Sequence, residues 1–166
     1  MFWDGGVDAD SSLKEKSEFY CLAERMSRII KDIITEFDEH VLVDKVFCEN
    51  EKMFADWVDL SKYELFREVS ELFKSKQYYE ISLPEDDKII DLIVESNFRY
   101  FTYISLYLPK TKLIILPTCH TEILVYSDCS DKIVEVLEPI VAKHSDDKYK
   151  IMCKRYGTVS VHNENT

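Results

Sequence analysis

Glycine is scarce in this chain, and its scarcity excludes the commonest nucleotide-binding motifs. The 166 residues include three glycines, Gly5, Gly6 and Gly157. A loop that cradles phosphate needs several glycines, because backbone N–H groups must approach the ligand closely. These three fit neither a P-loop nor a dinucleotide-binding fingerprint. Their number and placement argue against the common nucleotide-dependent enzymes.

Signals of export, disulfide bonding and metal binding are also missing. No purely apolar run approaches the roughly 20 residues that span a bilayer, and the opening residues MFWDGGVDAD lack the features of a secretory signal. The five cysteines are widely spread without a C-x-x-C pair, which predicts reduced thiols. No zinc-binding spacing occurs among the four histidines. We therefore expect a cytoplasmic protein without a membrane segment, metal centre or cofactor.

Acidic charge is abundant and unevenly placed. The net charge is −11, and residues 1–60 hold 15 acids and 7 bases, a net of −8. Residues 61–97 hold 9 acids and 5 bases, and residues 98–166 hold 8 acids and 9 bases. An acidic field repels phosphate backbones and attracts basic proteins. The charge therefore predicts a basic protein partner rather than nucleic acid, although solubility alone is an alternative reason for it.

Four helices are predicted from apolar residues spaced three and four apart. The first two follow capping boxes at Ser12–Glu15 and Ser61–Glu64 and extend to Phe37 and Phe73. Pro84 opens the third, with three acids in its first turn, where they suit the helix dipole. The fourth follows residues 127–130 and contains Pro139, which should kink or split it.

The stretch Asn97–Ser127 is the most strand-prone part of the chain. It holds three strand-like runs, with breaks at 109–111 and 117–120. The first run, from Phe98 to Leu108, has apolar side chains on both faces, so we expect a strand that is mostly covered on both sides in the middle of a sheet. Further strand signals lie at Tyr78–Leu83 and at 40–47, where an extra helical turn is the alternative, and a terminal hairpin is predicted at 149–162.

These elements predict an α+β fold. A mostly antiparallel sheet of about five to six strands, built on residues 98–127 and the C-terminal hairpin, packs against four helices. The length favours a single domain over residues 1–166, with 1–11 and 163–166 loose.

Two acidic segments are candidates for binding a partner. Trp57 lies among carboxylates, and an aromatic anchor ringed by acids suits a basic protein surface. The same tryptophan could instead be a core residue between two helices. The acids before the third helix form the second segment. The candidate partner-binding residues are Glu49, Glu51, Asp56, Trp57, Asp59, Glu85, Asp86 and Asp87.

The sequence Cys119–His120–Thr121–Glu122 is the one fragment that suggests catalysis. A thiolate nucleophile needs a base within hydrogen-bond reach, and Glu122 could orient the imidazole of His120. Adjacent residues on a strand point to opposite faces, so Cys119 and His120 pair only if the turn bends them together. A buried cysteine beside a turn residue is the structural alternative.

From these observations we expect a non-enzymatic, acidic inhibitor that binds a protein. The kind that best suits the sequence is a bacterial immunity protein that neutralises a basic toxin, such as a nuclease, by occluding its active surface. The alternatives are a small enzyme with a nonstandard site near Cys119, His120 and Glu122, and a regulatory or scaffold domain. The oligomeric state stays open.

Overall fold

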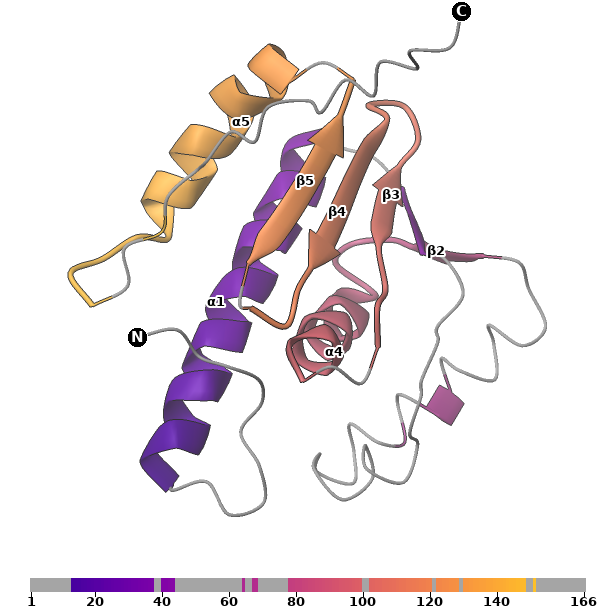
Figure 1. Cartoon of the computed structure of the whole chain (residues 1–166). Helices are drawn as coiled ribbons and strands as arrows, with labels where there is room; N and C mark the ends of the chain where they lie inside the picture. The colour runs from indigo at the N-terminus through magenta and orange to yellow at the C-terminus, as the bar shows by residue number, and fades with distance from the viewer. Residues whose placement is uncertain are drawn as a thin grey trace, which may run out of the picture.

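A computed structural model describes residues 13–37, 40–43, 64, 67–68, 78–99, 102–120, 122–128, 130–148 and 151. Within these ranges the fold is α+β, with one antiparallel sheet of five strands and three helices (Figure 1). The elements in chain order are α1 (Leu13–Phe37), β1 (Val41–Val43), β2 (Tyr79–Ile81), α4 (Asp87–Phe98), β3 (Leu106–Leu108), β4 (Leu113–Pro117), β5 (Ile123–Ser127) and α5 (Ser130–Lys143).

Helix α1 confirms the first helix prediction and supplies much of the core. It begins directly after Ser12 and ends at Phe37, the last residue of the apolar stripe. Side chains at three- and four-residue steps, such as Met26, Ile30 and Ile33, are buried along one side. An amphipathic helix of this kind is stabilised mainly by packing of that side against the rest of the fold.

Helix α4 begins later than predicted. Residues 83–86 form a turn, and the helix starts at Asp87, so Pro84 and Glu85 precede it. The cause is local, because Asp86 closes the turn twice. Its backbone N–H donates to the Ser82 carbonyl at 3.0 Å, and its carboxylate accepts from the Ser82 N–H at 3.0 Å. The prediction that three acids occupy the first helical turn was therefore wrong, and only Asp87 does so.

Helix α4 also ends later than predicted, because it runs through Phe98, where the first strand was expected to start. Residues 102–105 are not paired in the sheet, and β3 is confined to Leu106–Leu108. The deviation has a physical cause in Asn97, whose buried side chain binds the backbone that follows the helix. A side chain that satisfies backbone groups competes with the strand ladder for the same hydrogen bonds.

The sheet has the strand order β2-β1-β3-β4-β5, and every pair is antiparallel. Strand β3 is its middle strand, which confirms the central position predicted for the run that starts at Phe98. The signals at 78–83 and 40–47 correspond to β2 and β1, so the strand alternative is right over Val41–Val43.

The helices gather on one side of the sheet. In Figure 1, α1 and α4 lie behind the strands and α5 lies alongside β5, while no described helix crosses the near face. The buried side chains of β3 and β4, including Leu106, Leu108 and Ile115, join those of the helices in one core cluster. The outer face of β3 is less covered than expected, because Tyr107 is 37% exposed between two buried neighbours.

Helix α5 runs to Lys143 as one element with Pro139 inside it, so the predicted split does not occur. Of the second predicted helix, only Glu64, Arg67 and Glu68 are described, and all three are helical. The predicted terminal hairpin lies outside the described residues except for Ile151, which packs against the core. Among the described helices, none combines the length and apolar character needed to cross a membrane.

Candidate functional site

The outer face of the sheet gathers exposed aromatic side chains. Six large hydrophobic residues are exposed in the described part of the chain, and five of them fall on this face. Their exposed fractions lie between 37% for Tyr107 and 60% for Tyr103. Large apolar side chains gathered on one exposed surface often mark an interaction site. We name this surface the tyrosine face, and its members are Tyr78, Tyr103, Tyr107, Ile114 and Tyr126.

Strand alternation explains why these residues share a face. Successive side chains on a strand point to opposite sides, and in β3 and β4 the residues on either side of Tyr107 and Ile114 are buried in the core. Tyr103 lies four residues before Tyr107, an even number, and it is exposed between two buried residues in the segment before β3. Tyr78 lies two residues before the exposed Glu80 of β2.

The strand register aligns three members of the tyrosine face in one row. Tyr107 pairs with Ile114 across β3 and β4, and Ile114 pairs with Tyr126 across β4 and β5. The spacing between neighbouring strands is about 4.8 Å, so two tyrosines lie about 10 Å apart with an isoleucine between them. Side chains directly opposite each other on neighbouring strands are close enough to interact.

Charged side chains border the tyrosine face. Glu122 and Asp128 flank β5 with the parity of Tyr126, and both are exposed. At the opposite edge of the sheet, on β2, the carboxylate of Glu80 lies 3.2 Å from His40 Nδ1. Lys112, at the turn between β3 and β4, is exposed as well. In the described strands and at their ends, alternation therefore places three acids and one lysine on the same side of the sheet as the tyrosine face.

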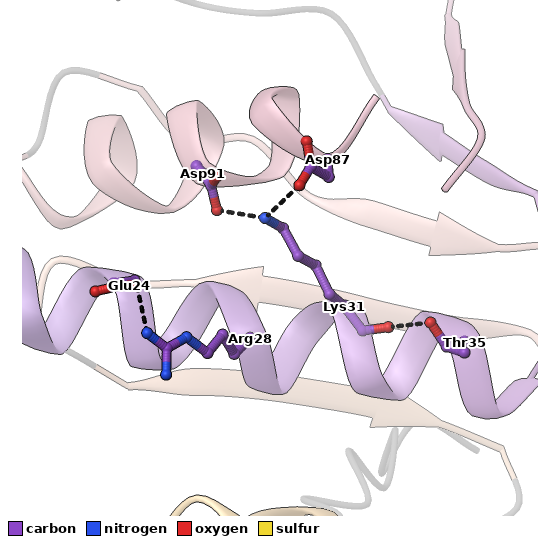
Figure 2. A network of polar contacts seen from close by, with 6 residues as sticks. All are labelled: Glu24, Arg28, Lys31, Thr35, Asp87 and Asp91. Carbon is purple, nitrogen blue, oxygen red and sulfur yellow. Dashed lines mark hydrogen bonds and ion pairs between the residues drawn. The ribbon is translucent and has the colours of Figure 1, made fainter. Parts of the chain in front are cut away.

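The acids predicted to bind a partner at the start of α4 are largely engaged within the protein. The carboxylate of Asp86 closes the turn with Ser82. Figure 2 shows Lys31 of α1 reaching toward Asp87 and Asp91 of α4, with Nζ 3.5 Å from Asp87 Oδ2 and 2.7 Å from Asp91 Oδ1. Glu85 is exposed. One internal cation thus offsets part of the local negative charge.

The other predicted binding residues, Glu49, Glu51, Asp56, Trp57 and Asp59, lie outside the described residues. Their proposed role stays a prediction. Among the predicted acids that the structure describes, Glu85 is exposed, while Asp86 and Asp87 are half-buried.

The residues of the suggested Cys/His site lie at the turn between β4 and β5 but differ in exposure. The Thr118 N–H donates to the Glu122 carbonyl at 2.8 Å and closes this turn. Cys119 is 7% exposed, whereas His120 and Glu122 are exposed. A thiolate nucleophile must be reachable by substrate, so the burial of Cys119 disfavours that chemistry.

A buried ion pair lies near the end of α4. Glu95 and Arg99 are one helical turn apart, with carboxylate and guanidinium 3.2 Å apart. Arg99 also donates to the Tyr20 hydroxyl at 2.9 Å, and its guanidinium lies 4.7 Å from the centre of the Phe19 ring. These contacts offset part of the cost of removing two charges from water. The buried pair is therefore explained by its neighbours within the fold.

A second ionic cluster joins α1 to the end of α5. Asp32 accepts from Lys143 Nζ at 2.8 Å and lies 2.7 Å from His144 Nε2. Partial burial is the largest single influence on the pKa of Asp32 and raises it. The hydrogen bonds and positive charges of Lys143 and His144 together outweigh burial, so the pKa lies below its ordinary 3.8. Arg25 and Asp146 add an ion pair at 2.6 Å.

Within the described ranges, no group of three or more histidine, cysteine, aspartate or glutamate side chains is placed to hold a metal ion. No protein-family model matches the chain, and no similar curated protein or solved structure was found. The candidate site therefore has to be judged on its own geometry, which singles out the tyrosine face.

The tyrosine face was not predicted from the sequence, although a signal for it is present there. Tyr103, Tyr107 and Ile114 alternate with buried residues, and Tyr126 lies between half-buried ones. The alternation was assigned to a strand covered on both sides because its two faces are similarly apolar. Tyrosine differs from the aliphatic residues of the inner face, since its hydroxyl favours positions that reach water.

Proposed function

We propose that this protein is a non-enzymatic inhibitor that binds a basic protein, of the kind represented by bacterial immunity proteins. It would act in the cytoplasm and block a toxin, such as a nuclease, by covering the surface that the toxin uses on its substrate. The observation that carries the proposal is a tyrosine-rich open sheet face in a chain of net charge −11.

The charge supports the choice of a basic partner. A toxin that acts on nucleic acid presents positive charge to phosphate groups, and an acidic inhibitor is attracted to that same surface. Electrostatic attraction of this type raises association rates 10- to 1,000-fold and fades as salt is added. A protein of net charge −11 repels other acidic proteins, including its own copies.

The tyrosine face supports protein binding over catalysis. Tyrosine is enriched at the centres of protein interfaces because it buries a large rigid ring and keeps one polar group. The enzyme alternative depends on Cys119, which is buried, whereas its proposed partners His120 and Glu122 are exposed. A regulatory or scaffold domain could use the same face, but it would not abolish the activity of its partner.

Co-expression with a candidate toxin tests the proposal. The toxin would be a basic nuclease domain encoded beside this gene, produced from a titratable promoter. We expect the chain to restore growth, to form a 1:1 complex and to abolish nuclease activity in vitro. A gene neighbourhood without a toxin, or a purified pair that forms no complex at micromolar concentration, would contradict the proposal.

Kinetics at different ionic strengths test the electrostatic part separately. We expect the association rate of the complex to fall at least about tenfold between 20 mM and 500 mM salt, while the dissociation rate changes much less. An association rate that is indifferent to salt would show that the acidic field does not guide binding.

A further inference from the structure

We propose that the tyrosine face is the surface that contacts the partner, and that the partner places arginine or lysine side chains on it. This inference rests on the proposed function, because that function supplies the basic partner. It replaces the acidic segment before α4 with the row Tyr107, Ile114 and Tyr126 as the centre of the interface.

The row is held on a rigid part of the fold. It lies on β3, β4 and β5, whose inward-facing side chains, such as Leu106, Ile115 and Val125, are packed in or against the core. Tyrosine has two side-chain torsions, so ordering it in a complex costs less conformational entropy than ordering a lysine or arginine. A row of rings on a fixed backbone is therefore prepared for binding before the partner arrives.

The electrostatic character of the tyrosine face complements a cationic partner. The faces of aromatic rings carry negative electrostatic potential and attract guanidinium and ammonium groups. Asp128 follows Tyr126 by two residues, about 7 Å along the strand, and Glu122 precedes Tyr126 by four residues; both are exposed. Tyrosine rings bordered by carboxylates suit an arginine, which can stack on a ring while it donates to an acid. Lys112, at the β3–β4 turn, is exposed, and its positive charge makes that end of the face less favourable for an arginine.

The same charges disfavour the other occupants of such a face. Aromatic side chains on a sheet can stack nucleic-acid bases, but those surfaces also carry positive charge for the phosphates. Here the flanking residues of β5 are acidic. A second copy of this chain would bring another net charge of −11 to the interface. A basic protein is the occupant that this charge favours.

The acids before α4 are weaker candidates because the fold already uses them. Asp86 holds the turn that precedes the helix, and Asp87 and Asp91 share Lys31. A partner would have to compete with these contacts. The contacts just named do not involve the tyrosine rings of the row.

Peptide titration of the full-length chain tests the surface. The probe is a 12-residue peptide with four arginines spaced by glycine and serine, followed by backbone amide shifts in ¹⁵N spectra. Controls are the same peptide with citrulline in place of arginine and an eight-nucleotide uridine oligomer. We expect shifts centred on Tyr107, Ile114 and Tyr126, and at least about tenfold weaker binding of both controls.

Matched variants test the named residues. Tyr107→Thr with Tyr126→Thr removes both rings and keeps residues that suit a strand, and the Kd for the peptide is expected to rise about tenfold or more. Glu122→Gln with Asp128→Asn is compared with Glu135→Gln and Glu138→Gln on α5, because both pairs change the charge equally. We expect the first pair to weaken binding more. Tyr126→Thr alone serves if the double variant has a lowered thermal midpoint.

Several outcomes would overturn the inference. These are shifts confined to α1, α4 or α5, equal binding of the citrulline peptide, or tight binding of the uridine oligomer. A concentration-dependent dimer that Tyr107→Thr disrupts would identify a second copy as the occupant.

If the wild-type chain protects against the toxin and the double tyrosine variant protects equally, the surface is wrong and the function stands. If the arginine peptide binds this face but the chain gives no protection, the proposed function is wrong and the surface stands.

Discussion

Asn97 and Ile104 are joined by two hydrogen bonds across the turn that follows α4. The side-chain amide of Asn97 donates to the Ile104 carbonyl at 2.9 Å, and its oxygen accepts from the Ile104 N–H at 3.1 Å. The amide also donates to the Pro117 carbonyl at 2.9 Å, and its oxygen accepts from the Thr102 hydroxyl at 2.6 Å. One buried side chain therefore links the end of α4, the segment before β3 and the end of β4.

Replacing this side chain is expected to be strongly destabilising. Asn97→Ala leaves the buried backbone groups of Ile104 and Pro117 without the partner they have now, and each unsatisfied group costs about 1–3 kcal/mol. We expect a loss of about 4 kcal/mol in the free energy of unfolding, measured by urea denaturation with circular dichroism.

Thr102→Val is the graded control for Asn97. It removes one hydroxyl from the network and keeps the shape, so we expect a smaller loss of about 1–2 kcal/mol. A loss below about 1 kcal/mol for Asn97→Ala would mean that water or a rearranged side chain satisfies the same groups.

The same network shows where sequence reasoning stopped. The long amphipathic pattern of α1 and the short apolar runs of β4 and β5 identified these elements, because each pattern is local. The end of α4 was not predictable in this way. Its final residues include Ser96 and Asn97, whose polar side chains are buried only because Thr102, Ile104 and Pro117 return to them. A contact with residues 5 to 20 positions away leaves no periodic signal.

The candidate site was equally hard to place. Charge predicted a basic partner, and it pointed to the acidic residues themselves as the contact surface. Which face of the sheet is covered depends on where α1, α4 and α5 pack, and this cannot be read from the alternation in β3. Asp87 illustrates the difficulty, since its partner Lys31 lies 56 positions earlier in the chain.

Acid is expected to weaken the contact between α1 and α5. The pKa of Asp32 is lowered in the folded state, so its stabilising effect is fully present above its ordinary pKa and is lost as pH falls through the folded value. Asp32→Asn should therefore lower the free energy of unfolding by up to about 1 kcal/mol at pH 6, and by progressively less as pH falls below 3.8. Urea titrations across this range measure the difference. The exposed control Glu135→Gln should show no such convergence, and a constant difference for Asp32→Asn would contradict the assignment.

Lys31 is expected to couple unequally to its two acidic neighbours. Its Nζ is 2.7 Å from Asp91 but 3.5 Å from Asp87, and electrostatic contacts weaken with distance and exposure. Double-mutant cycles with Lys31→Met should give a coupling of about 0.5 kcal/mol with Asp91→Asn and less with Asp87→Asn. Both couplings should shrink in 1 M salt. A larger coupling for Asp87 would show that it is the main partner of Lys31 in solution.

The two described cysteines are expected to differ sharply in reactivity, and the difference separates the inhibitor from the enzyme alternative. Cys21 is exposed on α1 and Cys119 is buried. In variants that keep one cysteine each, with serine at the other four positions, Cys119 should react with a disulfide reagent at least about 100-fold more slowly, because labelling requires local opening. Cys119→Ala and His120→Ala should each leave partner binding and protection unchanged. Rapid labelling of Cys119, together with loss of function in both alanine variants, would instead favour a catalytic site at the β4–β5 turn. Normal function in both variants would leave the imidazole and thiol as parts of a structural turn, with recognition on the tyrosine face beside it.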